Sequence, residues 1–209
     1  MKKVIRKPHN LVRAYWDDMR HFQIEAENVE KVRELYDRCY TAAMRNLPDD
    51  NELKKAVPNL PTFDKRGIRY VILSSFLFLE AFINQEYLDE MGFKNSPIEL
   101  TNTQKKNLDK IIFETSFDEK WSLWISDFSE TRTGDKLKVK GETEYQELMK
   151  LKDWRNQLTH YKIHHLMSVS QIESINNSRE AVKIAVQTVK WYSKHTKKEM
   201  PEWMKNELD

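Results

Sequence analysis

The chain has 209 residues, of which 39% are hydrophobic and 33% are charged, with only four glycines and six prolines. This length suits one folded domain with its own core, and the shortage of turn residues argues against a fold built of many short strands. The 35 basic and 33 acidic residues leave a formal net charge of +2, so no overall field marks the chain as a nucleic-acid binder, and affinity for RNA would have to come from local patches.

The first predicted helix covers residues 10–46. Its apolar side chains recur every seven positions, as expected of a helix with one buried stripe. The stripe consists of Tyr15, Phe22, Val29, Tyr36 and Ala43, joined at intermediate positions by Val32 and Cys39. The charged opposite face excludes full burial, and the pattern leaves open whether the stripe packs on its own chain, on another subunit or on a different protein. Three prolines in residues 47–61 indicate a linker. We therefore divide the chain into an N-terminal helical extension with its linker, residues 1–60, and a helical domain, residues 61–209.

The helical domain shows the apolar periodicity of helices throughout. Its predicted helices span residues 64–91, 103–114, a short segment from 118, 142–166 and 178–198. The first of these is the most hydrophobic, with Thr62 or Asp64 as its N-cap and Gly92 at its end. Aromatic residues at helical spacing in the short segment indicate core packing rather than stacking on RNA bases. They are Phe117, Trp121, Trp124 and Phe128. The predicted fold class is all-α.

Neither a secretion signal nor a membrane span is predicted. The basic residues 1–10 precede a polar stretch rather than the apolar core of a signal peptide. The most apolar run, residues 70–83, contains Glu80 and falls short of the ~20 residues that cross a bilayer. The single cysteine, Cys39, cannot form an internal disulfide, and its place in the apolar stripe predicts a buried, reduced thiol. We expect a cytoplasmic protein that does not bind membranes.

The run from Arg155 to His160 carries the groups needed to cleave RNA. If residues 144–166 form one regular helix, Asn156 and His160 lie one turn apart on one face, and Arg155 points about 100° away but can bend toward them. An imidazole exchanges protons near neutral pH, and a guanidinium matches phosphate oxygens. The pattern therefore predicts attack by the ribose 2′-hydroxyl on the adjacent phosphate, with Asn156 orienting the imidazole or the substrate and no metal required.

One imidazole cannot easily act as both base and acid on opposite sides of the same phosphorus. A second histidine is therefore expected. Its simplest source is His160 of another copy of the chain, brought into the same cleft by a two-fold axis. This reasoning predicts a homodimer with a composite active site.

The seven residues from Arg155 to Tyr161 resemble the Arg-x4–6-His signature of HEPN domains, in the form where Asn follows the Arg and an aromatic residue follows the His. Residues 75–84 resemble the first long helix of such domains, and the likeness covers about residues 62–200. It implies an antiparallel bundle of four or more helices, a dimer in which two motifs meet, and an endoribonuclease of phage defence or of a toxin–antitoxin system, with an antitoxin or other regulatory protein as a partner. Some HEPN domains lack activity, so the alternative is a non-catalytic module that binds RNA or a protein.

Several residues near the motif are compatible with two different roles, one at the site and one in the fold. Glu80 and Asn84, one turn apart, together with Tyr161, could support the motif, or the first two could be hydrogen-bonded at a helix boundary. Lys152 and Lys162 could contact the RNA backbone, or they could belong to a solvated helix face.

A zinc site is the remaining alternative, because His160 and His164 lie one helical turn apart. A third ligand is not obvious in the sequence, although His165 and Asp153 are close by. We therefore expect neither a metal nor another cofactor.

Overall fold

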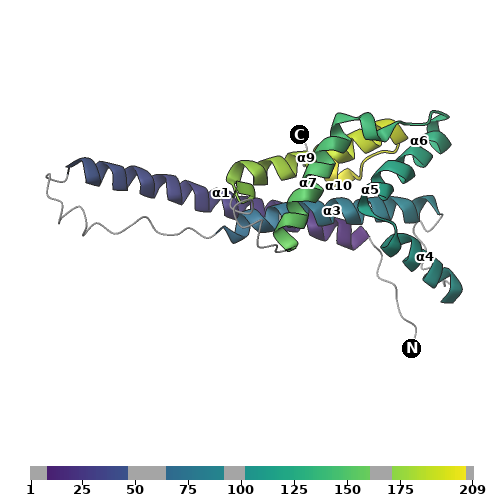
Figure 1. Ribbon diagram of the computed structural model, residues 1–209, viewed down its shortest axis with the longest axis horizontal. Coiled ribbons are helices and arrows are strands. Elements are labelled where there is room, and N and C mark those ends of the chain that lie inside the picture. Colours follow the sequence, from purple (N-terminus) through teal and green to yellow (C-terminus); the bar gives the residue numbers. More distant parts are fainter. Residues whose placement is uncertain (1–8, 47–64, 92–101, 161–170, 206–209) are drawn as a thin grey trace.

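The computed structural model describes residues 9–46, 65–91, 102–160 and 171–205, and every regular element within these ranges is a helix (Figure 1). The elements in chain order are α1 (His9–Asn46), α3 (Arg66–Glu90), α4 (Asn102–Glu114), α5 (Phe117–Glu119), the π-helical turn η1 (Lys120–Trp124), α6 (Ile125–Thr133), the 3-10 turn η2 (Val139–Gly141), α7 (Thr143–Thr159), α9 (Ile175–Thr196) and α10 (Glu202–Lys205). The predicted all-α class is confirmed.

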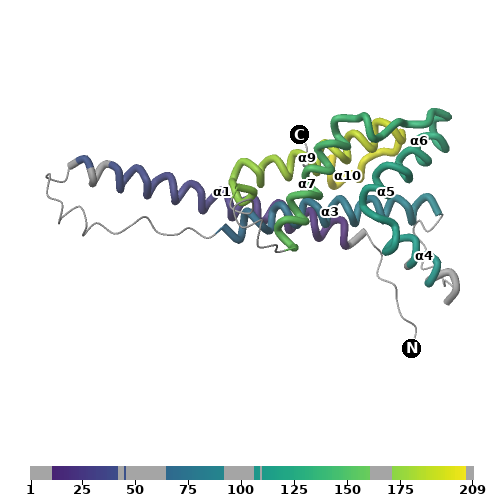
Figure 2. The backbone as a smooth tube through the Cα atoms, viewed as in Figure 1, coloured from purple at the N-terminus to yellow at the C-terminus, as the bar shows by residue number. Residues whose placement is uncertain are grey.

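Helix α3 contacts α1, α7 and α9, and α9 in turn lies against both α1 and α7 (Figure 2). It is long and apolar enough to cross a membrane, with a mean hydropathy of 1.4 in its most apolar window, but 56% of that window is buried inside the protein. Its fully enclosed side chains include Ile72, Phe78, Leu79 and Ile83. The backbone of Lys65 precedes the helix without a side-chain cap, and the predicted caps Thr62 and Asp64 lie outside the described residues.

The first half of α1 is part of the core. It runs antiparallel to α3, because Ala26 lies against Gly67 near the start of α3 while the ring of Trp16 meets that of Phe78 further along, with centroids 5.2 Å apart. Trp16 is 1% exposed. The predicted boundary near residue 60 therefore does not separate two cores, since the beginning of α1 and the helices after residue 65 share a single one.

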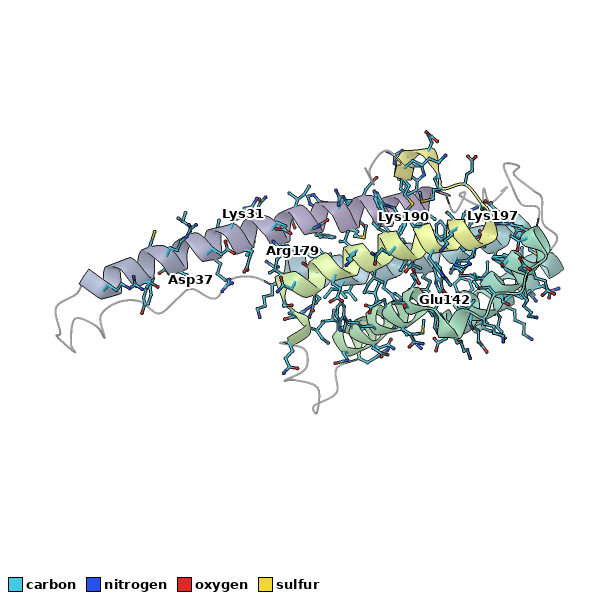
Figure 3. The ribbon with its side chains drawn as sticks, turned by 90° about the horizontal axis from the view of Figure 1, so that it is seen from above. Lys31, Asp37, Glu142, Arg179, Lys190 and Lys197 are labelled. Atoms are coloured by element: carbon cyan, nitrogen blue, oxygen red, sulfur yellow. The ribbon has the colours of Figure 1, made fainter. Side chains whose placement is uncertain are left out.

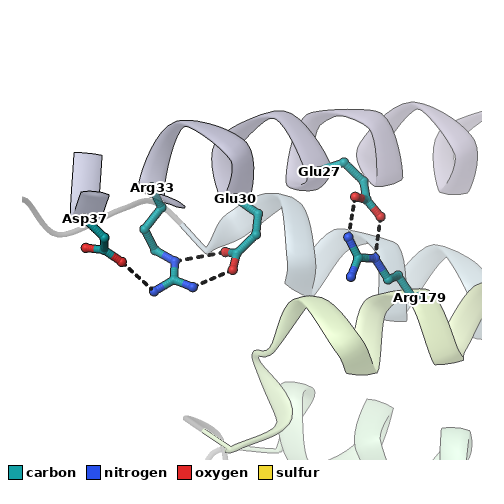
Figure 4. A network of polar contacts seen from close by, with 5 residues as sticks. All are labelled: Glu27, Glu30, Arg33, Asp37 and Arg179. Atoms are coloured by element: carbon teal, nitrogen blue, oxygen red, sulfur yellow. Dashed lines mark hydrogen bonds and ion pairs between the residues drawn. The ribbon is translucent and has the colours of Figure 1, made fainter. Parts of the chain in front are cut away.

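The second half of α1 extends past the other helices (Figure 1). Val32 is 58% exposed there, and Cys39 is exposed as well. The prediction that Cys39 is buried is wrong, because this part of α1 extends beyond the core and no other described helix covers it there. At the point where α1 leaves the core, both carboxylate oxygens of Glu27 accept hydrogen bonds from Arg179 of α9, at 2.7 and 2.6 Å (Figure 4).

Helix α9 runs parallel to α3. At one end, Arg69 of α3 donates to the carboxylate of Glu173, just before α9 begins, with an Nε to Oε1 distance of 2.7 Å. At the other end, the hydroxyl of Tyr192 donates to Oε2 of the buried Glu86 at 2.6 Å. Desolvation and the neighbouring carboxylate together raise the pKa of Tyr192, so this phenol remains a neutral donor.

The predicted aromatic stripe after residue 116 lies in the core, which confirms its packing role. It begins with a capping box, in which Ser116 and Glu119 each accept a hydrogen bond from the other's backbone N–H. The chain then widens into the π-helical turn η1 before α6. Trp121 stacks on Phe82 and Trp124 on Tyr87, with ring centroids 6.4 and 4.3 Å apart.

Candidate functional site

Helix α7 carries the motif at its carboxyl end. It packs through Tyr145, Leu148, Leu151 and Trp154, all of which are buried. It runs antiparallel to α9, because Lys150 binds Glu180 near the start of α9 while Thr143 and Glu144 line a groove with its later residues.

The predicted extent of this helix is wrong at its end. The sequence predicts a helix to residue 166, whereas α7 ends at Thr159 and His160 is its C-cap, with φ −106° and ψ 87°. The hydroxyl of Thr159 bonds to the carbonyl of Arg155 at 2.9 Å, and such back-bonding, like the weak helix propensity of Thr, disfavours continuing a helix. Asn156 and His160 are thus joined by one last backbone hydrogen bond of 2.9 Å, not as two residues inside a longer helix.

Arg155 and Asn156 do come together. The Nη1 of Arg155 donates to Oδ1 of Asn156 at 3.0 Å. The guanidinium carbon lies 5.1 Å from the centre of the Phe76 ring on α3, a cation–π contact. Both polar side chains are half-buried. The arginine is therefore held between α7 and α3, and Asn156 is its only hydrogen-bond acceptor among the described residues, which leaves its other N–H groups available to an anion there.

His160 is exposed at the tip of the helix. Among the residues that the structure describes, no side-chain hydrogen bond or ion pair joins its imidazole to Arg155 or Asn156. The amide oxygen of Asn156 is occupied by Arg155 and does not orient the ring. The three predicted catalytic residues thus lie within six consecutive residues, but a side-chain contact joins only two of them, Arg155 and Asn156.

Glu80 is engaged by a lysine that sequence reasoning missed. The Nζ of Lys120, in η1, lies 3.8 Å from Oε1 of Glu80 and 5.8 Å from the ring centre of Trp124. The lysine side chain is 3% exposed, and burial lowers its pKa, against the opposing effect of Glu80. Its position among aromatic residues of the short segment was the one signal in the sequence that pointed to a buried lysine.

Asn84 follows Glu80 by one turn of α3. Its Oδ1 is buried and has no hydrogen-bond partner among the described residues. Neither Glu80 nor Asn84 contacts the motif residues through a hydrogen bond or ion pair in the described part of the chain; the observed partner of Glu80 is Lys120 of η1, at ion-pair distance.

The lysines near the motif are paired with carboxylates. Lys152 reaches Asp118 in α5, with an Nζ to Oδ1 distance of 2.5 Å, and Lys150 reaches Glu180 at 2.6 Å. Hydrogen bonding to Glu180 raises the pKa of Lys150. These contacts tie α7 to its neighbours and partly neutralise the charge that an RNA backbone would seek.

Four residues that the sequence analysis named at or near the motif fall outside the described ranges. They are Tyr161, Lys162, His164 and His165. Within the described ranges, no three His, Cys, Asp or Glu side chains gather closely enough to hold a metal ion.

Comparisons with protein-family models, with curated proteins and with solved structures find no match to this chain. Any functional assignment must therefore be argued from the side chains themselves.

Proposed function

We propose that this protein is a metal-independent endoribonuclease of the HEPN type that acts as a homodimer in the cytoplasm. The observation that supports it best is the end of α7, where Arg155 is held by Phe76 and Asn156 while His160 stands exposed beside them. A half-buried, preorganised guanidinium is suited to stabilising the charge that builds on a phosphate in the transition state.

In the proposed reaction, the ribose 2′-oxygen attacks the adjacent phosphorus and its proton passes to the imidazole of His160. The bond from phosphorus to O2′ forms as the bond from phosphorus to O5′ breaks. The departing O5′ takes a proton from the imidazolium of the second copy's equivalent histidine, and Arg155 stabilises the phosphorane oxygens. The products are a 2′,3′-cyclic phosphate and a 5′-hydroxyl, with no water consumed.

The exposure of His160 suits the dimeric arrangement. The ring is exposed and no side chain in the described residues binds it, so it is accessible to substrate and to a second subunit. In the proposed biological setting, a toxin–antitoxin or phage-defence system, an antitoxin or other regulatory protein would restrain the enzyme. Expression of the wild-type chain should then arrest bacterial growth, and the His160→Ala chain should not.

The decisive experiment is RNA cleavage in the presence of EDTA by the wild type and by Arg155→Ala and His160→Ala. We expect a loss of at least about 100-fold in each variant, since general acid–base and electrostatic groups each contribute that much. The exposed His21 and Arg38, both on α1, supply matched controls as His21→Ala and Arg38→Ala, which should cleave normally. Activity that survives in both motif variants, or that EDTA abolishes, contradicts the proposal.

A second candidate is a non-catalytic HEPN-like module that binds RNA or a protein. It is favoured by one observation: no described side chain orients the imidazole of His160. This candidate predicts that the purified wild type binds RNA and leaves it intact at near-neutral pH, and that cleavage products are absent at every enzyme concentration.

A further inference from the structure

Four lysines line the outward face of α9. Lys183, Lys190, Lys194 and Lys197 follow one another at steps of seven, four and three residues, which keeps them on one side of a helix, with Lys197 as its C-cap. All four side chains are exposed. They span about 21 Å along the axis, at 1.5 Å per residue. Figure 3 looks onto this region, with Lys190 and Lys197 labelled on the helix that runs between α1 and α7. We call this set the α9 lysine row.

The row differs from most other cations nearby because it is not neutralised. Lys150 pairs with Glu180, Arg179 with Glu27, and Lys198 with Glu86. In the described part of the chain, by contrast, no ion pair joins any lysine of the row to a carboxylate. Four unpaired charges held on one rigid helix face attract a partner that carries repeated negative charge.

Two hollows flank the row and meet at Lys194. The first, of about 360 Å³, lies between α9 and the start of α7, and offers the polar groups of Thr143, Gln187 and Thr188 beside Lys190 and Lys194. Glu144 and Glu147 also line this hollow, and the carboxylate of Glu147 lies 3.8 Å from the Nζ of Lys150.

The second hollow, of about 260 Å³, continues past the end of α9. It adds Lys136, His195 and Lys197 to Lys194, with Asp135 as its one acidic side chain. The two hollows thus share Lys194 and follow the second half of α9, and together they are lined by four lysines and three carboxylates.

A polynucleotide backbone fits this surface better than a membrane does. The large apolar residues of α9, such as Ile184, Val189 and Trp191, are buried, so the face has no side chain to insert into a bilayer. A row of lysines can neutralise successive phosphates, and hydroxyl and amide groups in the groove can bond to phosphate and ribose oxygens.

We propose that the α9 lysine row binds the phosphates of a single RNA strand whose adjoining part reaches the motif on α7. The proposal rests on the proposed function for the identity of the ligand. The row begins one turn after Glu180, which binds Lys150, and Lys150 precedes Arg155 by about 7.5 Å along the axis of α7. Because α7 and α9 are antiparallel, Lys190, Lys194 and Lys197 lie beside the start of α7, and only the Lys183 end of the row points toward the motif. A strand that follows the row from Lys197 to Lys183 and continues in the same direction therefore heads toward Arg155 and His160, roughly 28 Å along the helix axes from Lys194.

The test measures binding apart from cleavage. The full-length His160→Ala chain is titrated into a fluorescent single-stranded oligouridylate at several salt concentrations. The titration is repeated with a chain that carries Lys190→Gln, Lys194→Gln and Lys197→Gln in addition to His160→Ala. We expect the triple change to weaken binding at least about tenfold at 0.1 M salt and to reduce the slope of log K against log salt by about 2, since each lost phosphate contact removes ~0.7.

The matched control is Lys31→Gln, Lys106→Gln and Lys110→Gln, which removes the same charge from exposed positions on α1 and α4. It should bind nearly as the parent does. Equal weakening in the two triple variants, no RNA binding by the parent, or binding to phosphatidylserine vesicles without binding to RNA overturns the proposal. If the wild type binds RNA through these lysines but does not cleave it, the proposed nuclease function is overturned and RNA binding by the row stands. If the wild type cleaves RNA and the triple substitution leaves cleavage unchanged, the proposed role of the row is overturned and the nuclease function stands.

Discussion

Among single residues, Lys120 has the most unusual environment. Its ammonium is enclosed between α3 and η1, 3.8 Å from a Glu80 side chain that is itself 35% exposed. At this distance the attraction of the Glu80 carboxylate is too weak to offset the loss of hydration of the ammonium. Burial therefore dominates and lowers the pKa of Lys120. The charged form is therefore less favourable in the folded chain than in the unfolded one.

This environment predicts that Lys120→Met is more stable than the wild type at pH 7, by about 1 kcal/mol, since an apolar side chain of similar length fills the site without desolvation. Between the lowered pKa and the ordinary lysine value of about 10.4, the unfolded wild type binds more protons than the folded one, so its free energy of unfolding rises with pH. The advantage of the variant should shrink from pH 7 to pH 10 in urea titrations.

The control for this prediction is Lys136→Met, whose side chain is 67% exposed. Its effect should stay within about 0.5 kcal/mol and should not change with pH. A loss of more than about 2 kcal/mol in Lys120→Met would mean that the protein depends on the buried charge.

At the scale of elements, periodicity predicts which segments are helical but not how they end. The stripe from Tyr145 to Trp154 predicts α7, because burial on one face is what apolar spacing records. The end at Thr159 depends on the hydrogen bond from its hydroxyl to the carbonyl of Arg155 and on the weak helix propensity of threonine. The apolar spacing continues past this point, so it does not indicate where the helix ends. The π-helical turn likewise comes from the fit of Trp121 and Trp124 against α3, a tertiary effect that no period in the sequence expresses.

The pairing of α1 with α3 depends on their close approach at Gly67. A Cβ at this position would lie 3.4 Å from the backbone nitrogen of Ala26, an ordinary contact. We therefore expect Gly67→Ala to stabilise the protein by about 0.5 kcal/mol, because alanine restricts the unfolded chain at a helical position. Gly67→Val adds two methyl groups where α1 already touches, and should cost about 1–3 kcal/mol. Thermal unfolding of the two variants measures both effects; an alanine variant less stable than the wild type would contradict the expectation that a Cβ fits against Ala26.

At the scale of the whole molecule, the candidate site was only partly predictable. Arg155 and Asn156 are neighbours in sequence, so their contact follows from local geometry, and α7 brings them to α3 as its buried face requires. The ion pairs of Lys120 and Lys152 join segments that are distant in sequence, and only the folded arrangement reveals them. The same holds for α1, whose predicted stripe was compatible with three different partners. The ring found against Phe78 is that of Trp16, which lies beside the predicted stripe, whereas the stripe residues Tyr15 and Phe22 are half-buried.

Because the first half of α1 completes the only core among the described residues, it should unfold together with α3, α7 and α9. Trp16 is 1% exposed and lies edge-on against Phe78 and Trp203. Trp16→Ala should therefore lower the global free energy of unfolding by about 3–5 kcal/mol, as expected for an emptied aromatic site.

Val32→Ala, 16 residues further along the same helix, is the matched comparison. This valine is 58% exposed and lies beyond the core, so its replacement should change stability by less than about 0.5 kcal/mol. Urea titrations followed by tryptophan fluorescence and by far-ultraviolet circular dichroism measure both variants. Coincident curves with a large shift for Trp16→Ala alone are the expected result, whereas two separate transitions would mean that α1 folds independently of the other helices.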